Sequence, residues 1–407
     1  MRLRHMIHRL CRNASSIKDT MTDVPAPSLR ALCDCTCQTH SLSGISRRRL
    51  LMGALSGLAL AGCKSAVPLD APLQIDVSPS AGRIDVHHHA SPPAWLRTVQ
   101  NRGIVGAALH WSAEKSLADM DRAGIQTAIL SITPPGVVFA DLDVDANRRL
   151  ARECNEWQAQ LAVDYPGRFG FFAALPMGDT AGSLEEIAYS LDVLKANGIG
   201  LLTSYGDKWL GDPSFLPVME ELNRRRAVVY THPTSASCCT SLQNVPATMI
   251  EYGTDTTRTI ASILFSGNAQ RFRDIRWIFS HAGGTMPFLI ERFERNPIIM
   301  PTTAHMFPQG VRAALQQFYY DTAQSSNVAA MSALTEVVPT SQVLFGTDFP
   351  YRNALEQLRG LRKTGLFDAS ALTLIERRNA LELLGQARTS ALGGSAGNAL
   401  TQPYLPQ

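Results

Sequence analysis

The 407-residue sequence predicts an α/β fold, a TIM (β/α)8 barrel, on three observations. Strand-like and helix-like segments alternate from Arg83 onward. Eight of these segments have strand character, which is the number that closes such a barrel. Histidine or aspartate ends the first, fifth, sixth and eighth, and only a closed barrel gathers those four ends around one mouth. A doubly wound open sheet, which binds its ligand at one switch point, is the alternative.

The strands are predicted from short runs of β-branched and aromatic residues. The runs are 84–88, 127–132, 169–175, 199–204, 227–232, 275–281, 318–322 and 343–348. Amphipathic segments between them predict helices, among them 116–123, 147–165, 183–197, 215–225 and 286–293. Ala123-Gly124 and Asn197-Gly198 follow two of these helices, and we expect each pair to end its helix and lead into a strand. No Gly-x-Gly-x-x-Gly follows a strand, which argues against a dinucleotide cofactor.

The N-terminal segment predicts an export leader. Arg47-Arg48 precede the uncharged apolar stretch 52–61, which is too short for a permanent membrane span and is typical of a twin-arginine signal. The stretch ends in Leu-Ala-Gly-Cys63, which resembles a lipoprotein box, so a lipid on Cys63 would be the only membrane anchor. We therefore expect a periplasmic or membrane-anchored protein. A start codon downstream of the leader would make it cytoplasmic instead.

Composition supports one large folded domain. The hydrophobic fraction of 45% is enough for a sizeable core, and the formal net charge is only +3. No Lys/Arg run stands in the folded part, which argues against a nucleic-acid partner. Outside the leader the cysteines are Cys154, Cys238 and Cys239, which do not indicate a disulfide framework. The expected organisation is a leader over 1–63, a linker over 64–82, the barrel over 83–385 and a loose tail over 386–407.

Three histidines and one aspartate predict a metal site. His87 and His89 lie two apart on one strand, so both point to the same face while His88 points away. His232 precedes a proline, which keeps the backbone extended at the ligand. Asp348 follows Phe-Gly-Thr at a strand end, and a buried aspartate needs a cation or strong donors. No lysine ends the fourth strand to bridge a second ion, so we expect one divalent ion.

The role of His281 is open between a fifth ligand and an acid/base. A neutral imidazole near pH 7 suits proton transfer, and we favour that role. The Gly283-Gly284 pair behind it lets the backbone approach a ligand closely.

The substrate pocket is weakly marked in the sequence. Trp111, Tyr205 and Phe349 lie near predicted strand ends, where they would either stack on a ring or pack in the core. Arg292 and Arg352 are candidates for a bidentate pair with a carboxylate.

The combined motifs resemble the amidohydrolase superfamily over Arg83 to Leu384. Within it they resemble the amidohydrolase-related branch of decarboxylases that act on aminocarboxymuconate semialdehyde or 6-methylsalicylate. The supporting motifs are Ile84–His89, Ser116–Asp121, Leu210–Pro213, Tyr230–Pro233, Ser280–Gly284, Tyr320–Ala323 and Leu344–Pro350.

The resemblance implies a ligand set, a metal and a reaction. His87, His89, His232 and Asp348 would hold the ion, usually Zn²⁺ and in some members Mn²⁺. His281 would transfer the proton, so that His281 and Asp348 form the catalytic pair. The implied reaction is decarboxylation of a small aromatic or unsaturated carboxylic acid without an organic cofactor.

Two other functions and the assembly state stay open. A metal-bound water at the same ligands would hydrolyse an ester, lactone or amide. An exported metal- or solute-binding lipoprotein is the non-enzyme alternative, although such proteins tend to be two-lobed. A homodimer is neither indicated nor excluded by the sequence.

Overall fold

The computed structural model describes residues 81–391, except 101, 105, 237 and 239–241. The predicted leader, most of the predicted linker and the end of the predicted tail lie outside the described residues. The signal at Arg47-Arg48 and the lipid site at Cys63 therefore stay predictions.

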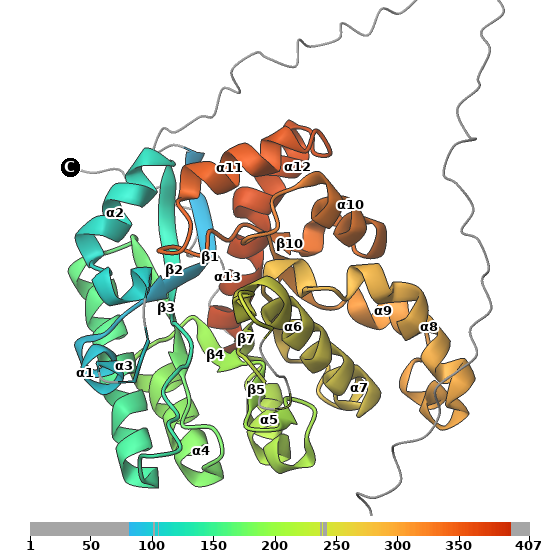
Figure 1. The fold of residues 1–407 in the computed structure, drawn as a ribbon, viewed down its shortest axis with the longest axis horizontal. Helices are drawn as coiled ribbons and strands as arrows, with labels where there is room; N and C mark the ends of the chain where they lie inside the picture. The colour runs from blue at the N-terminus through green and yellow to red at the C-terminus, as the bar shows by residue number, and fades with distance from the viewer. Residues whose placement is uncertain (1–80, 101, 105, 237, 239–241, 392–407) are drawn as a thin grey trace, which may run out of the picture. The chain divides into compact units, whose positions relative to one another are not determined.

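Eight parallel strands form the centre of the fold, in the ring order β1-β2-β3-β4-β7-β8-β9-β10 (Figure 1). The ring is closed between its first and last members by backbone hydrogen bonds. The amide of Val86 donates to the carbonyl of Phe345 at 3.0 Å, and that of His89 donates to Phe349 at 2.8 Å. The predicted barrel and its eight strands are therefore confirmed. The strands are β1 (Arg83–Ala90), β2 (Ile125–Ile132), β3 (Phe169–Ala174), β4 (Gly198–Leu202), β7 (Val228–His232), β8 (Arg276–Phe279), β9 (Tyr319–Asp321) and β10 (Val343–Leu344).

Helices surround this ring, and a two-stranded antiparallel hairpin follows β4 (Figure 1). The hairpin strands are β5 (Ser204–Tyr205) and β6 (Lys208–Trp209). The helices are α1 (Pro93–Val99), α2 (Ala113–Arg122), α3 (Val144–Asp164), α4 (Thr180–Ala188), α5 (Leu216–Arg224), α6 (Ala247–Phe265), α7 (Asn268–Arg271), α8 (Ile290–Ile299), α9 (Val311–Leu315), α10 (Val328–Val337), α11 (Ala354–Lys363), α12 (Ala369–Thr373) and α13 (Asn379–Ala391). Helix α13 runs past the predicted domain end at 385.

The barrel interior is filled with side chains below the strand ends. Inward-facing residues of neighbouring strands form a buried apolar cluster, in which Phe172 stacks on Tyr230 with ring centroids 5.2 Å apart. A larger cluster joins the outer faces of the strands to the helices. Because the interior is packed, a ligand has room only at the C-terminal ends of the strands, where the loops begin.

One of the two predicted helix ends is correct. Gly124 has a φ of +63° directly after α2, as expected for a residue that ends a helix in the left-handed region. The second expectation, at Asn197-Gly198, is wrong because Lys195 takes the left-handed conformation there, with a φ of 59°. Gly198 instead opens β4, where a Cβ would lie 2.4 Å from the carbonyl oxygen of Val228. Close strand packing therefore explains this glycine.

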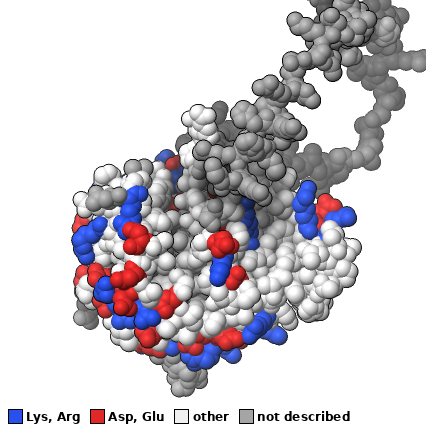
Figure 2. Space-filling model, turned by 60° about the horizontal axis from the view of Figure 1, so that its bottom comes forward, with Lys and Arg blue, Asp and Glu red and all other residues white. Residues whose placement is uncertain are grey.

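The surface carries charges of both signs. Figure 2 shows Lys and Arg side chains interspersed with Asp and Glu over one face, with wide uncharged areas between them. Of the helices between residues 81 and 391, none is both long and apolar enough to cross a membrane. Cys154 is buried and Cys238 is exposed.

Candidate metal centre

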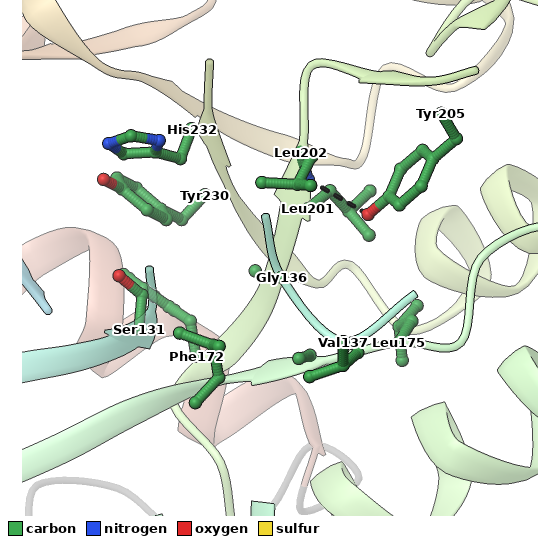
Figure 3. A pocket seen from close by; sticks show the side chains of 13 residues that line it. Ser131, Gly136, Val137, Phe172, Leu175, Leu201, Leu202, Tyr205, Tyr230 and His232 are labelled. Carbon is green, nitrogen blue, oxygen red and sulfur yellow. Dashed lines mark hydrogen bonds between the residues drawn. The ribbon is translucent and has the colours of Figure 1, made fainter. Parts of the chain in front are cut away.

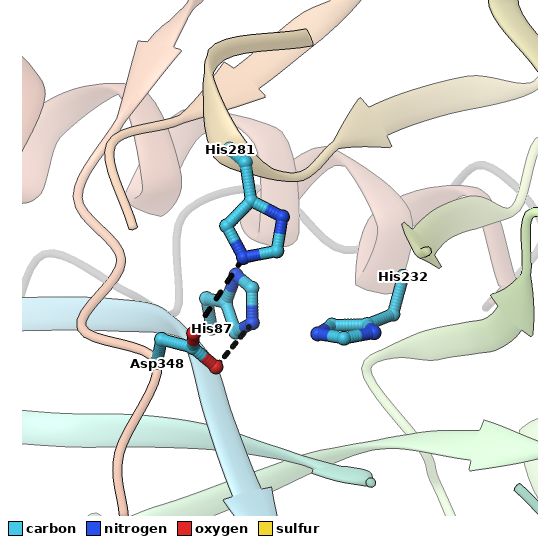
Figure 4. A group of neighbouring side chains, drawn as sticks. All are labelled: His87, His232, His281 and Asp348. Atoms are coloured by element: carbon cyan, nitrogen blue, oxygen red, sulfur yellow. Dashed lines mark ion pairs between the residues drawn. The ribbon is translucent and has the colours of Figure 1, made fainter. Parts of the chain in front are cut away.

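Four strand ends bring their ligand-type side chains into one cluster (Figure 4). His87 on β1, His232 at the end of β7, His281 after β8 and Asp348 after β10 place one potential ligand atom each within 4.8 Å of the others. His89 belongs to the same cluster, since its Nε2 lies 3.2 Å from His87 Nε2 and 2.9 Å from Asp348 Oδ1. The structure thus brings together all five residues that the sequence singled out for metal binding and proton transfer. A tetrahedral site uses four ligands, so the cluster offers one side chain more than such an ion needs.

His88 lies on the opposite side of β1, as the two-residue period predicts. Its Nδ1 is 2.9 Å from Asp85 Oδ2 and its Nε2 is 2.8 Å from Ser116 Oγ. Asp85 also accepts a 3.0 Å hydrogen bond from the amide of Thr347. The side chain of His88 therefore supports the junction between the first strand and the chain segment that leads to Asp348.

Asp321, at the end of β9, orients two members of the cluster. Its Oδ2 accepts a 2.8 Å hydrogen bond from His87 Nδ1, which directs His87 Nε2 toward the centre. Its Oδ1 accepts a 3.0 Å hydrogen bond from the amide of His281. Asp321 was not among the predicted site residues, although it follows the aromatic run Phe318–Tyr320 in the same way that other site residues follow their strands.

The tautomer of His232 also suits a ligand. Its Nδ1 lies 2.8 Å from the carbonyl oxygen of Pro233, which only an N–H can approach as a donor. Its Nε2 therefore carries the lone pair, and this buried atom has no hydrogen-bond partner among the described residues. A buried, unpaired imidazole nitrogen that faces a carboxylate and other imidazoles fits a metal ligand.

The electrostatics of the cluster favour a positive charge. Burial opposes protonation of His87, but the carboxylates of Asp321 and Asp348 outweigh it and raise the pKa of His87 to about 10. Burial likewise opposes ionisation of Asp348, yet the charge of His87 and hydrogen bonds from His281, His87 and His89 hold its pKa well below the usual range. Burial lowers the pKa of His232, so this imidazole is neutral. A site that stabilises a cation in this way suits a divalent ion, which would displace the proton of His87.

Two cluster residues and the neighbouring Gln324 have backbones in the left-handed region, where residues other than glycine are uncommon. The φ angles are 55° for His281, 55° for Gln324 and 65° for Asp348. Gln324 Nε2 donates a 2.8 Å hydrogen bond to Asp348 Oδ2. Such conformations persist where the surrounding structure holds them and often mark functional sites. Gln324 carried no signal in the sequence.

A cavity of about 880 Å³ opens onto the cluster. Helix α6 forms one wall through Thr248, Met249, Tyr252 and Gly253, and the segment after β2 contributes Pro134 and Pro135. The remaining lining residues include His232, His281, Gln324, Asp348 and Tyr351. None of the residues that line this cavity is a lysine or an arginine.

Three of the five candidate substrate-binding residues lie away from this cavity. Trp111 packs against Trp157, with ring centroids 5.4 Å apart. Phe349 stacks on His88 at 4.7 Å on the outer side of β1. Arg292 is exposed on α8. The predictions for Trp111, Phe349 and Arg292 are therefore not supported, because proximity to a strand end in the sequence does not fix the direction of a side chain.

The other two candidate substrate-binding residues are Tyr205 and Arg352, and neither of them lines the large cavity. Tyr205 lines a separate small pocket that shares His232 with the large cavity (Figure 3). Arg352 forms an ion pair with Glu356 at 3.0 Å on the first turn of α11, and it is not among the lining residues of the cavity.

The fold and the site together define a metal-dependent enzyme of the amidohydrolase type. The barrel carries a His-x-His pair on its first strand, a histidine at the end of the fifth, a histidine after the sixth and an aspartate after the eighth. The chain belongs to the amidohydrolase family, whose family model matches residues 84–386. This result confirms the resemblance found in the sequence.

Within this family, the chain is similar to several decarboxylases of aromatic acids. The chain is 40% identical over 281 residues to a 6-methylsalicylic acid decarboxylase of Aspergillus aculeatus, covering 66% of this chain and 84% of the relative. It is 38% identical over 276 residues to a 6-methylsalicylic acid decarboxylase of Penicillium expansum, covering 66% and 85%. The fold is similar to the crystal structure of a dihydroxybenzoic acid decarboxylase of Polaromonas with bound manganese and 2-nitroresorcinol. The two structures have a TM-score of 0.64 and share 20% sequence identity. The match covers 77% of this chain and 99% of the Polaromonas chain.

Replacing Asp321 with asparagine is expected to weaken metal binding by about 10- to 100-fold, the usual cost of losing an outer-shell carboxylate. The amide keeps the shape of the side chain but removes the charge that supports His87. Competition with a chelator measures the affinity. The matched control is Asp143→Asn at the exposed N-cap of α3, where asparagine caps a helix as well as aspartate does. Equal affinities for the two variants would contradict the role of Asp321.

Proposed function

We propose that this chain is a metal-dependent decarboxylase of a small aromatic carboxylic acid of the 6-methylsalicylate type. The observation that carries the proposal is the buried cluster of four histidines and one aspartate at the mouth of the barrel, which opens into a cavity of about 880 Å³. Pockets of this size accommodate small organic ligands. The relatives named above, which share 40% and 38% identity, are decarboxylases of such an acid.

In this proposal His87, His89, His232 and Asp348 hold one divalent ion. Imidazole nitrogens with a carboxylate oxygen suit both Zn²⁺ and Mn²⁺. When bound, the ion supplies a positive charge that anchors the substrate carboxylate or the adjacent hydroxyl. Because no lysine or arginine among the described residues lines the cavity, the ion would be the main counter-charge for the carboxylate.

His281 delivers the proton. Its ring reaches the cavity wall and is less buried than His87, with 12% of the side chain exposed. Its Nε2 lies 3.6 Å from Asp348 Oδ2, and its Nδ1 has no hydrogen-bond partner among the described residues. In the reaction, the ring carbon that bears the carboxylate takes a proton from the imidazolium. The bond between that carbon and the carboxylate then breaks, CO₂ leaves, and the electron pair restores the aromatic ring.

Hydroxybenzoates test the proposal directly. The protein would be loaded with Zn²⁺ or Mn²⁺, its metal content measured, and each form assayed for CO₂ release from 6-methylsalicylate. A parallel panel of lactones and aryl esters would be followed by acid release. We expect CO₂ from the hydroxybenzoate in at least one metal form. Acid release from the ester panel without any CO₂ would contradict the proposal and favour a hydrolase.

A further inference from the structure

Gln324, in the loop after β9, uses its side chain at a position where the backbone favours glycine. Its φ is 55°, a conformation that glycine adopts without a steric cost. Its Nε2 donates a 2.8 Å hydrogen bond to Asp348 Oδ2, and the residue lines the large cavity. A carboxylate accepts hydrogen bonds only, so the amide nitrogen must face it. The side chain therefore gives Asp348 a donor that glycine could not provide.

The loop that carries this glutamine is fixed against the segment after β10 that carries the aspartate. On one side of the glutamine, Thr322 Oγ1 accepts a 3.2 Å hydrogen bond from the amide of Gly346. On the other side, Ser326 Oγ donates to Gln357 Oε1 at 2.5 Å, and Gln357 Nε2 donates to the carbonyl oxygen of Thr347 at 3.3 Å. These contacts hold the glutamine within reach of the aspartate.

The two oxygens of the Asp348 carboxylate have different surroundings (Figure 4). Oδ1 lies 2.9 Å from His89 Nε2 and 3.2 Å from His87 Nε2. Oδ2 accepts the hydrogen bond from Gln324 and lies 3.6 Å from His281 Nε2. Oδ1 thus faces the imidazoles that would bind the ion, and Oδ2 faces the imidazole that would deliver the proton.

This division of the carboxylate matters for the proposed reaction. A carboxylate can bind a metal ion through one oxygen or through both. A catalytic ion needs a position that the protein leaves open for the substrate. If both oxygens of Asp348 bound the ion, the second oxygen would occupy such a position. A hydrogen bond to an ionised carboxylate is roughly twice as strong as a neutral one, so a donor on Oδ2 opposes that arrangement.

We infer that Gln324 is a positioning residue that keeps Asp348 a one-oxygen ligand, with Oδ1 directed at the ion and Oδ2 directed at His281. The inference rests on the metal site of the proposed function and deepens it. Gln324 acts through Asp348, because its amide nitrogen contacts the carboxylate. A coordination position of the ion then stays open for the substrate.

Removing the donor tests the inference. Gln324→Met keeps an unbranched side chain without an N–H, and Gln324→Gly removes the side chain where the backbone already suits glycine. The glycine variant serves if the methionine variant does not fold. Each protein would be saturated with Co²⁺, which binds the same kinds of nitrogen and oxygen ligands. The visible absorption of Co²⁺ weakens as its coordination number rises, so the spectrum reports whether Oδ2 has joined the ion.

We expect weaker visible absorption per bound Co²⁺ in both variants than in the wild-type protein, with the cobalt content unchanged. Their kcat/KM on 6-methylsalicylate should fall by about 10- to 100-fold, the usual effect of losing an outer-shell partner. The matched control is Gln270→Met on α7. Gln270 is exposed, and α7 leads into the N-terminal end of β8, whereas His281 follows the C-terminal end of that strand. This variant should have the wild-type spectrum and kinetics.

The outcomes separate the inference from the proposed function. A wild-type cobalt spectrum in either Gln324 variant would overturn the inference, and a rise in KM alone would then assign the glutamine to substrate binding. Loss of cobalt from the variants would also overturn it, because Gln324 would then be needed to retain the ion. If the wild-type protein bound Co²⁺ but released no CO₂ from any hydroxybenzoate, the decarboxylase proposal would fail, while the spectra would still decide the role of Gln324.

Discussion

Replacing His281 with asparagine is expected to lower kcat by about 100- to 10,000-fold, the usual contribution of a general acid or base. The variant should keep its metal. His281 reaches the cavity wall, while His87, His89, His232 and Asp348 remain to bind the ion. The backbone of His281 is held by Asp321 and keeps its place in the variant. Elemental analysis and steady-state kinetics on the same preparation measure both quantities.

The matched control is His305→Asn, because His305 is exposed in the segment after α8. This variant should show wild-type kinetics and metal content. If His281→Asn lost metal in proportion to activity, His281 would be a ligand. The cluster permits that result, since the His281 ligand atom lies within 4.8 Å of those of His87, His232 and Asp348.

Replacing His89 with alanine is expected to remove most of the bound metal and, with it, the activity. The Nε2 of His89 lies 3.2 Å from His87 Nε2 and 2.9 Å from Asp348 Oδ1, so a shared ion would lose one of four ligands. The loss of affinity should exceed the roughly 10- to 100-fold effect of an outer-shell partner. Titration with Zn²⁺ and with Mn²⁺, monitored by competition with a chelator, gives the affinities.

His88→Ala is the control for that experiment, because it removes the neighbouring imidazole from the other face of the same strand. The ion should stay bound in this variant, although the support of the Asp85 carboxylate is lost. Full metal occupancy of His89→Ala would show that His89 is not a ligand. His281 would then be the remaining candidate for the fourth position.

The sequence was sufficient to predict the barrel because all eight strands carry one signal and four of them carry a second. β-branched and aromatic runs mark the strands, and the ligand-type residues mark the ends that face the mouth. The helix ends were harder to predict. Asn197-Gly198 has the composition of a helix end, but its glycine is explained by the nearby Val228 carbonyl, a contact between strands that no local pattern reveals.

The structure brings together the site residues that were predicted on strands or at the ends of strand-like runs, whereas residues farther along the loops were not predicted. The period of two along β1 separates His87 and His89 from His88 in the sequence, and the structure shows the same separation. The contact of Gln324 with Asp348 depends on a left-handed loop residue and could not be foreseen. Trp111 and Phe349 are aromatic residues near strand ends, yet both rings pack on other side chains.

The closing seam of the barrel has a consequence for synthesis of the chain. His89 and Asp348 meet across the seam between β1 and the segment after β10, although 259 residues separate them along the chain. A ribosome that adds about 5–20 residues per second needs roughly 10 to 50 s to make that interval. Throughout this time the nascent β1 has an unpaired edge, which is a liability for aggregation. In the proposed site of four ligands, the ligand set would be complete only after the last strand has emerged, and binding of the ion would then stabilise the closed ring.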